Sequence, residues 1–127
     1  MSRAETGRLG ENAAAEYLEK LGYRIVERNY SRRCGEIDII AYKDGFICFV
    51  EVRTRAEGSM VSGAESVDIR KMRRVYKTAC LWLMEHDVAC QPRFDVAEMV
   101  SSKDGGRIER INYIENAFGA EVCDEIF

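Results

Sequence analysis

The stretch over residues 35–55 constrains the fold more than any other part of the chain. It reads GEIDIIAYKDGFICFVEVRTR, with a run of β-forming residues on either side of Asp44-Gly45. Asp-Gly between two such runs is a strong signal for a two-residue hairpin turn. We therefore predict a β-hairpin whose register places Asp38 opposite Glu51. Its two strands are expected over 36–42 and 46–54.

This register creates an electrostatic conflict. Side chains directly opposite on one face lie about 4.5–5.5 Å apart at Cβ, so Asp38 and Glu51 repel each other unless a cation lies between them. The same register puts Glu36 opposite Arg53. The strand over 46–54 is apolar on both faces, which predicts a central strand covered on both sides. A buried carboxylate needs a cation or a hydrogen-bond network, so burial makes the acidic pair the main functional clue.

Patterns along the rest of the chain predict two helices and three further strands. In order, these are a helix over 3–21, a strand over 23–30, a polar connection over 29–35, a helix over about 65–87, and strands over 91–100 and 107–114 that form a second hairpin. This order is typical of an α/β (α+β) fold, a mixed sheet with a helix on each side. We predict a single domain over residues 1–120 and a C-terminal tail over 121–127.

Composition excludes several classes of protein. With 127 residues, 46% hydrophobic and 32% charged, the chain matches one globular domain. No apolar run approaches the roughly 20 residues that span a bilayer, and residues 1–18 lack the apolar core of a signal peptide. We expect a cytoplasmic protein without membrane association. The five cysteines are scattered, and with a single histidine they indicate free thiols rather than a zinc site.

The first helix carries one acid on its small and apolar face. Gly7, Glu11, Ala14 and Leu18 follow each other at steps of four, three and four. Glu11 is then either an edge residue whose carboxylate reaches water, or a carboxylate aimed into the interior toward a cation. Gly7 on the same face predicts a close approach of this helix to its neighbour.

Positive charge is concentrated between residues 53 and 77. Seven Lys and Arg residues stand there against three acids, although the whole chain has a net charge of −3. A charged helix face is commonly just solvated, but the macrodipole disfavours cations near a helix N-terminus, where these residues cluster. Phosphate binding is the alternative explanation. The candidate nucleic-acid-binding residues are Arg55, Arg70, Lys71, Arg74 and Lys77.

The acids predict a metal site. Asp38 and Glu51 from neighbouring strands, with Glu11 from the first helix, would form a set of hard oxygen ligands of the kind that suits Mg²⁺ or Mn²⁺. Such a metal polarises a phosphoryl oxygen and lowers the pKa of a bound water. Arg53, two residues after Glu51, would lie beside that water. Glu11, Asp38, Glu51 and Arg53 are therefore the candidate catalytic residues, with Asp38 and Glu51 as the metal ligands.

These residues carry a resemblance to a known group of proteins. Glu51-Val52-Arg53, preceded by Asp38, resembles the D…ExK site of the restriction-endonuclease-like PD-(D/E)xK nuclease superfamily. More closely, the chain resembles the uncharacterised bacterial YraN family, placed in that superfamily. The matching segments are GRLGENAAAEYLEKLGY, GEIDIIA, FVEVRTR, RFDV and INYIENAF. The resemblance implies a restriction-endonuclease-like core with four to five strands, a role related to nucleic acid, and metal-ligand positions at Asp38 and Glu51.

One position departs from the pattern. The superfamily has lysine where this chain has Arg53, and lysine there is thought to orient or deprotonate the attacking water. Arginine supplies charge but cannot act as a base, since its pKa is above about 12. Its planar fork fits instead a bidentate pair with Glu36 or Glu51, which would make the cluster a structural salt bridge. Lys71 is a candidate substitute for the missing lysine.

Three hypotheses follow from these observations. The first is a divalent-metal-dependent nuclease that acts on DNA or RNA, including structured or branched forms. The second is a nucleic-acid-binding module with weakened catalysis, favoured by Arg53. The third is a protein-interaction module, which the acidic net charge and a pI near 5.3 favour. The sequence leaves assembly into a homo-oligomer open.

Overall fold

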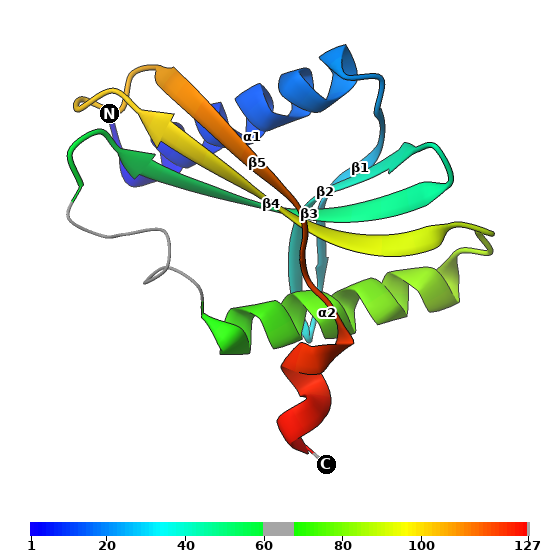
Figure 1. Ribbon diagram of the computed structural model, residues 1–127. Helices are drawn as coiled ribbons and strands as arrows, with labels where there is room; N and C mark the ends of the chain where they lie inside the picture. The colour runs from blue at the N-terminus through cyan, green and yellow to red at the C-terminus, as the bar shows by residue number, and fades with distance from the viewer. Residues whose placement is uncertain (60–67, 127) are drawn as a thin grey trace.

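The chain forms a five-stranded mixed sheet with one helix packed on each face (Figure 1). A computed structural model describes residues 1–59 and 68–126. Its elements are α1 (Arg3–Lys20), β1 (Arg24–Arg32), β2 (Gly35–Lys43), β3 (Phe46–Ala56), α2 (Ile69–Glu85), β4 (Gln91–Ser101), β5 (Ile108–Phe118) and the 3₁₀ helix η1 (Ala120–Ile126). The predicted α/β class, with a mixed sheet flanked by helices, is confirmed.

The strands lie in the sheet in their sequence order, β1-β2-β3-β4-β5. Only β3 and β4 are parallel, and their pairing runs without a break from Phe46–Gln91 to Ala56–Ser101. Parallel neighbours need a crossover connection, and here α2 provides it. The run 47–51 of β3 is completely buried, which confirms the prediction of a central strand covered on both faces.

The predicted hairpin is present, and its turn is the one that Asp-Gly favours. Asp44 and Gly45 both have positive φ, 50° and 84°, as a type I′ turn requires. The register matches the prediction from Lys43–Phe46 as far as Ile39–Val50, where the pairing of β2 with β3 ends.

Beyond that point the expected register is wrong. Glu36 pairs with Ser31 of β1 and does not lie opposite Arg53 in a β2–β3 ladder. The physical reason is that β2 separates from β3 at Asp38, whose side chain takes the backbone N–H of Val52 that a longer ladder would have used.

Each helix covers its own hydrophobic core. On one face, α1 packs Ala14, Ala15 and Leu18 against β-strand residues that include Ile39 and Val50. On the other face, α2 contributes Trp82 to a cluster rich in aromatic side chains, which also contains Tyr30, Phe49, Phe94 and Phe118. The two cores hold the helices at fixed positions on opposite sides of β3, and that placement determines which side chains reach Asp38 and Glu51.

Helix boundaries follow from the caps. Ser2 and Glu5 form a capping box at the start of α1. Asp68 is the N-cap of α2 and accepts a hydrogen bond from the Arg70 backbone N–H at 2.9 Å, so α2 begins at Ile69. The predicted start near residue 65 falls outside the described residues.

The polar connection predicted over 29–35 is largely strand. β1 continues to Arg32, and only residues 33–34 separate it from β2. Asn29 adopts φ 53° where the alternation of β1 is interrupted, and asparagine tolerates this conformation better than most residues. The sequence pattern was misleading here because polar residues also occupy the exposed side of an edge strand.

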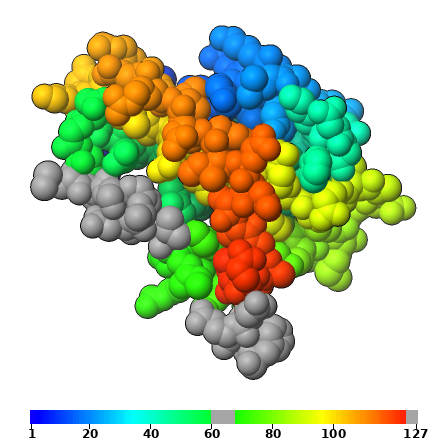
Figure 2. Space-filling view, in the orientation of Figure 1, coloured from blue at the N-terminus to red at the C-terminus, as the bar shows by residue number. Residues whose placement is uncertain are grey.

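The end of the chain is attached to the body of the protein. Figure 2 shows β5 passing into η1 along one face of the molecule, with η1 beside α2. Val122 is buried in the α2-side core, and its carbonyl accepts a hydrogen bond from Arg73 Nε at 2.7 Å. The segment predicted as a tail from residue 121 thus includes a core residue.

No helix in the described ranges is long and apolar enough to cross a membrane. The five cysteines are free thiols, as expected. Cys48 is buried in β3, and burial raises its pKa to about 12. It therefore behaves as a small hydrophobic residue.

The close approach of α1 to the sheet occurs at Gly10 rather than at Gly7. A Cβ on Gly10 would lie 2.0 Å from Thr54 Oγ1 of β3, whereas a Cβ on Gly7 would meet nothing within 4 Å. The prediction that Gly7 makes this contact is wrong, because Gly7 lines a cavity between α1 and the sheet, whereas Gly10 lies against Thr54 of β3.

This difference predicts opposite effects of the same substitution. Gly7→Ala should raise the free energy of unfolding by about 0.5–1 kcal/mol through helix propensity. Gly10→Ala gains the same propensity but overpacks against Thr54, which costs about 1–3 kcal/mol, so it should be the less stable variant by at least 1 kcal/mol. Urea denaturation measures both, and equal stabilities would contradict the assigned contact.

Candidate functional site

Asp38 lies on β2 just beyond the end of its pairing with β3. Its Oδ2 accepts the backbone N–H of Val52 at 2.8 Å. Burial raises the pKa of Asp38 to about 7, the Val52 hydrogen bond opposes this rise, and the negative charges of Glu11 and Glu51 add to it. A positive charge placed near this carboxyl group would therefore stabilise its ionised form.

Glu51 is the buried acid at the centre of the sheet, with a side chain only 3% exposed. Its Oε2 lies 2.8 Å from Arg53 Nε, and its Oε1 lies 3.5 Å from Lys71 Nζ. Arg53 comes from the same strand and Lys71 from the first turn of α2, so the crossover helix supplies a cation to the acidic pair. Lys71 remains half-exposed, whereas Arg53 is mostly buried.

Glu11 lies on α1 at the other side of this group and is partly buried. Burial raises its pKa, Glu36 adds to the rise, and Arg28 and Arg8 oppose it. Its charge also acts on Asp38. However, residues 1–59 and 68–126 contain no group of three or more His, Cys, Asp or Glu side chains close enough to hold a metal ion together. The three predicted acids interact electrostatically without forming a three-carboxylate cluster.

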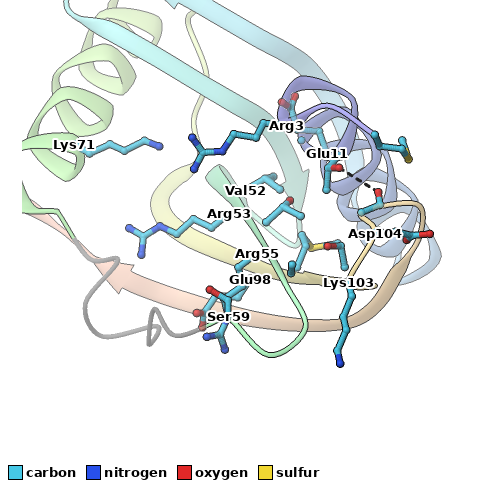
Figure 3. Close-up of a pocket in the computed structure, with 18 residues that line it drawn as sticks. Arg3, Glu11, Val52, Arg53, Arg55, Ser59, Lys71, Glu98, Lys103 and Asp104 are labelled. Atoms are coloured by element: carbon cyan, nitrogen blue, oxygen red, sulfur yellow. Dashed lines mark hydrogen bonds between the residues drawn. The ribbon is translucent and has the colours of Figure 1, made fainter.

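A cavity of about 690 Å³ opens beside these residues. Glu11, Val52, Arg53 and Lys71 line it, so the cavity meets the acidic pair through its immediate neighbours. Its far wall is the turn between β4 and β5, which Thr6 Oγ1 of α1 joins through a hydrogen bond to the Gly105 carbonyl at 3.1 Å. Figure 3 shows side chains from α1, β3 and α2 converging on this space.

The predicted phosphate-binding residues separate into two groups. Arg55 and Lys71 line the cavity. Arg70, Arg74 and Lys77 lie on the exposed face of α2 and are not among the lining residues. Helical periodicity predicts Arg70, Arg74 and Lys77 on one stripe with Lys71 beside it, and in the structure Lys71 reaches Glu51 of β3.

Two cations of the cavity were not predicted. Arg3 at the first position of α1 and Lys103 in the β4–β5 turn both line it. A signal for Arg3 was present, because a cation at a helix N-terminus is disfavoured by the macrodipole. Lys103 had no such signal, since the pairing of two turns distant in sequence is a tertiary property.

A second buried acid has a purely structural explanation. Asp95 of β4 is completely buried and accepts hydrogen bonds from Arg93 Nε and Nη2, from the Tyr113 hydroxyl and from the Asn116 backbone N–H. Arg93 Nη2 in turn donates to the Tyr23 hydroxyl at 2.7 Å. This network is satisfied by donors within the protein, so the RFDV segment stabilises the β4–β5 pairing.

The donor set at Asp38 and Glu51 suits a hard divalent cation. Mg²⁺ commonly uses one or two carboxylates and keeps several waters, so two acids are sufficient. Burial and the negative charges of Glu11 and Glu51 raise the pKa of Asp38, and a divalent cation beside the carboxylate would oppose both effects. Glu51 would have to exchange part of its contact with Arg53 or Lys71 for the metal.

Fold and site together define a mixed α/β protein with a largely buried acidic pair beside a cationic cavity. The model of the uncharacterised protein family UPF0102 matches residues 10–99. The chain belongs to this family, which confirms the expected resemblance to the uncharacterised bacterial YraN proteins.

Relatives named UPF0102 protein match almost the whole chain. The protein of Alkaliphilus metalliredigens is 43% identical over 113 residues, 88% of this chain and 96% of the relative. That of Symbiobacterium thermophilum is 45% identical over 121 residues, 94% and 100% of the two chains. That of Myxococcus xanthus is 41% identical over 121 residues, which are 93% of this chain and 92% of the relative. Chain length is therefore similar across these relatives.

The raised pKa of Asp38 predicts a pH-dependent stability penalty. Since its folded-state pKa of about 7 lies above the ordinary value of 3.8, the folded state binds the proton more tightly, and stability falls as pH rises from about 4 to 7. Asp38→Asn, whose amide oxygen still accepts the Val52 N–H, should be more stable than wild type at pH 8, by at most about 4 kcal/mol, and similar at pH 4.

Chemical denaturation in the presence of EDTA at both pH values measures this difference. Asp87→Asn, at an exposed acid after α2, is the matched control and should follow the wild-type pH profile. A variant Asp38→Asn that is equally destabilised at pH 4 and pH 8 would show that the carboxylate is already compensated.

Proposed function

We propose that this protein is a divalent-metal-dependent phosphodiesterase that acts on nucleic acid, DNA or RNA. The observation that carries the proposal is an acidic pair, the buried Glu51 and the half-buried Asp38, held against two cations beside an open cavity. Structural acids are normally satisfied from within, as Asp95 is. Asp38 instead has a raised pKa beside a second carboxylate, which is an arrangement found more often at functional sites.

Asp38 and Glu51 would hold Mg²⁺ or Mn²⁺. The metal would supply Lewis-acid polarisation of a phosphoryl oxygen and a water of lowered pKa. The Val52 N–H fixes the orientation of Asp38, because its hydrogen bond to Oδ2 keeps the carboxylate in one rotamer. The burial of Glu51 in β3 excludes water from one side of the site.

Arg53 and Lys71 have different roles in this proposal. Arg53 contributes positive charge at the phosphate and, as an arginine, is not a candidate general base. Lys71 is half-exposed and comes from α2 rather than β3. Its ammonium group can therefore leave Glu51 and contact a phosphate oxygen instead. Lys71 is therefore the candidate for the lysine that the superfamily pattern has at the position of Arg53.

Purified protein should cleave labelled oligonucleotides in Mg²⁺ or Mn²⁺ but not in EDTA. The test includes single-stranded, duplex, flapped and junction forms of DNA together with RNA. Asp38→Asn and Glu51→Gln should each lower the rate by about 100-fold or more, because each removes a charge that interacts with the reacting phosphate or its metal.

Glu16→Gln, at an exposed acid on α1, controls for the loss of one negative charge and should leave the rate unchanged. Thermal melts of all three variants separate loss of activity from loss of folding. Absence of metal-dependent cleavage on all substrates, or cleavage that persists in folded Asp38→Asn protein, would refute the proposal.

Arg53→Lys should increase the cleavage rate. A lysine at this position adds a group that can lose a proton, and it replaces the planar guanidinium that holds Glu51 at 2.8 Å. Glu51 would then exchange more readily with a metal. Single-turnover cleavage measures the effect, and a lower rate with an unchanged melting temperature would assign Arg53 an essential role as arginine.

A nucleic-acid-binding protein with little or no catalysis is the second candidate. The specific observation in its favour is that both Glu51 oxygens already have a cationic neighbour, at 2.8 Å and 3.5 Å. Salt-dependent binding without cleavage would select this alternative. The exposed α2 cations Arg70, Arg74 and Lys77 would then be expected to contribute phosphate contacts.

A further inference from the structure

The cavity has a cationic character that the acidic chain does not share. Five Lys and Arg side chains line it against three acids, among the residues that the structure describes. On a chain with a net charge of −3, this is a local reversal of sign. Local concentration of one sign inside a concave surface focuses the electrostatic potential and favours a ligand of the opposite sign.

Two of the three acids accept hydrogen bonds from residues of β4, β5 or the turn between them, on the side of the cavity where the acids themselves lie. Glu98 of β4 accepts a hydrogen bond from Asn112 Nδ2 at 3.2 Å. Asp104 accepts from Ser102 Oγ at 2.6 Å and from the Gly106 N–H at 2.8 Å, which closes the β4–β5 turn. These hydrogen bonds come from neutral donors, so they hold the two carboxylates in the wall without removing their charge. Five cations against three acids leave the lining side chains with a net charge of +2.

Three cations approach the cavity from three different elements. Figure 3 shows Arg3 from the start of α1, Arg53 from β3 and Lys71 from α2 pointing into the same opening, whereas Lys103 points away. Arg3 is exposed and forms no ion pair with any residue in the ranges 1–59 and 68–126. Its position at the first residue of α1 is unfavourable for the helix, so helix stability does not explain it.

The cavity offers little for reading bases. No aromatic side chain is among its described lining residues, so it lacks the stacking platform that single-strand binding proteins use to hold bases. Charged groups that contact phosphates fix the position of a nucleic acid but carry no sequence information. The ligand chemistry that fits is a chain of phosphodiesters held by its backbone.

We propose that Arg3, Arg53 and Lys71 form a three-sided clamp on the sugar–phosphate backbone next to the reacting linkage, and that the protein binds nucleic acid without reading its bases. This inference rests on the proposed function for the identity of the ligand. It adds Arg3, which precedes the family match over residues 10–99, as a binding residue on the wall opposite α2. DNA and RNA both have phosphodiester linkages, so either could be the ligand.

Fluorescence anisotropy in EDTA tests the clamp without catalysis. Labelled DNA and RNA oligonucleotides of equal length and two unrelated sequences are titrated over a range of salt concentrations. Arg3→Gln should weaken binding and lower the magnitude of the log–log salt slope by about 0.7–0.9, the value of one phosphate contact. Arg3→Lys should retain most of the affinity and the slope, because it conserves the charge.

Lys20→Gln is the matched control, because it removes the same charge from the same helix about 25 Å from Arg3. It should leave the salt slope unchanged. Arg3→Gln should also melt at or above the wild-type temperature, since it removes a cation from the N-terminus of α1. The two sequences should bind within about threefold of each other.

The results separate this inference from the proposed function. If binding depends on Arg3 but no metal-dependent cleavage occurs, the clamp stands and the nuclease proposal fails. If cleavage occurs and Arg3→Gln behaves like Lys20→Gln, the clamp is refuted and the nuclease proposal stands. A preference above about tenfold for one sequence would refute recognition through the backbone alone.

Discussion

The parallel pairing of β3 with β4 is the constraint on which the rest of the structure depends. Antiparallel neighbours connect through tight turns, but a parallel pair forces the chain across one face of the sheet. That crossing contains α2, and its first turn brings Lys71 to the acid at the centre of β3. Because α1 covers the opposite face, one central strand is approached from both sides, and the mixed sheet itself assembles the site.

Asp95, which is buried, and Asp38, which is half-buried, show what distinguishes a structural carboxylate from a candidate site. Asp95 is surrounded by donors from β4 and β5, and their hydrogen bonds replace the water it lost on burial. Asp38 has the Val52 N–H as donor and the charge of Lys71 in its favour, but Glu11 and Glu51 oppose them, so its burial is compensated only in part. Asp95 is the more deeply buried of the two, yet Asp38 is the less well compensated, and only the incompletely compensated acid favours a cationic ligand.

The sequence predicted the hairpin, the central strand and the two-sided sheet well, because those features depend on local turn chemistry and alternation. It predicted the acidic pair through the register of Asp44-Gly45, although β2 leaves β3 at Asp38 and a side-chain hydrogen bond replaces the expected ladder. Gly7 and Gly10 lie on nearby faces of one helix, and only the docking angle decides which contacts Thr54. The cavity joins α1 to the β4–β5 turn across most of the chain, and no pattern within a sequence window encodes that contact.

The two short turns that flank β2 also bear on the order in which the protein assembles. β1, β2 and β3 are joined by only residues 33–34 and 44–45, so their pairings close small loops at little entropic cost. The pairing of β3 with β4 must wait for a loop that contains all of α2, and non-local pairings of this kind slow folding. We therefore expect Asp38 and Glu51 to meet while still hydrated, and to lose water only when α2 arrives with Lys71. Water therefore screens the repulsion between the two acids while the strands pair, and the repulsion becomes strong only after α2 has docked.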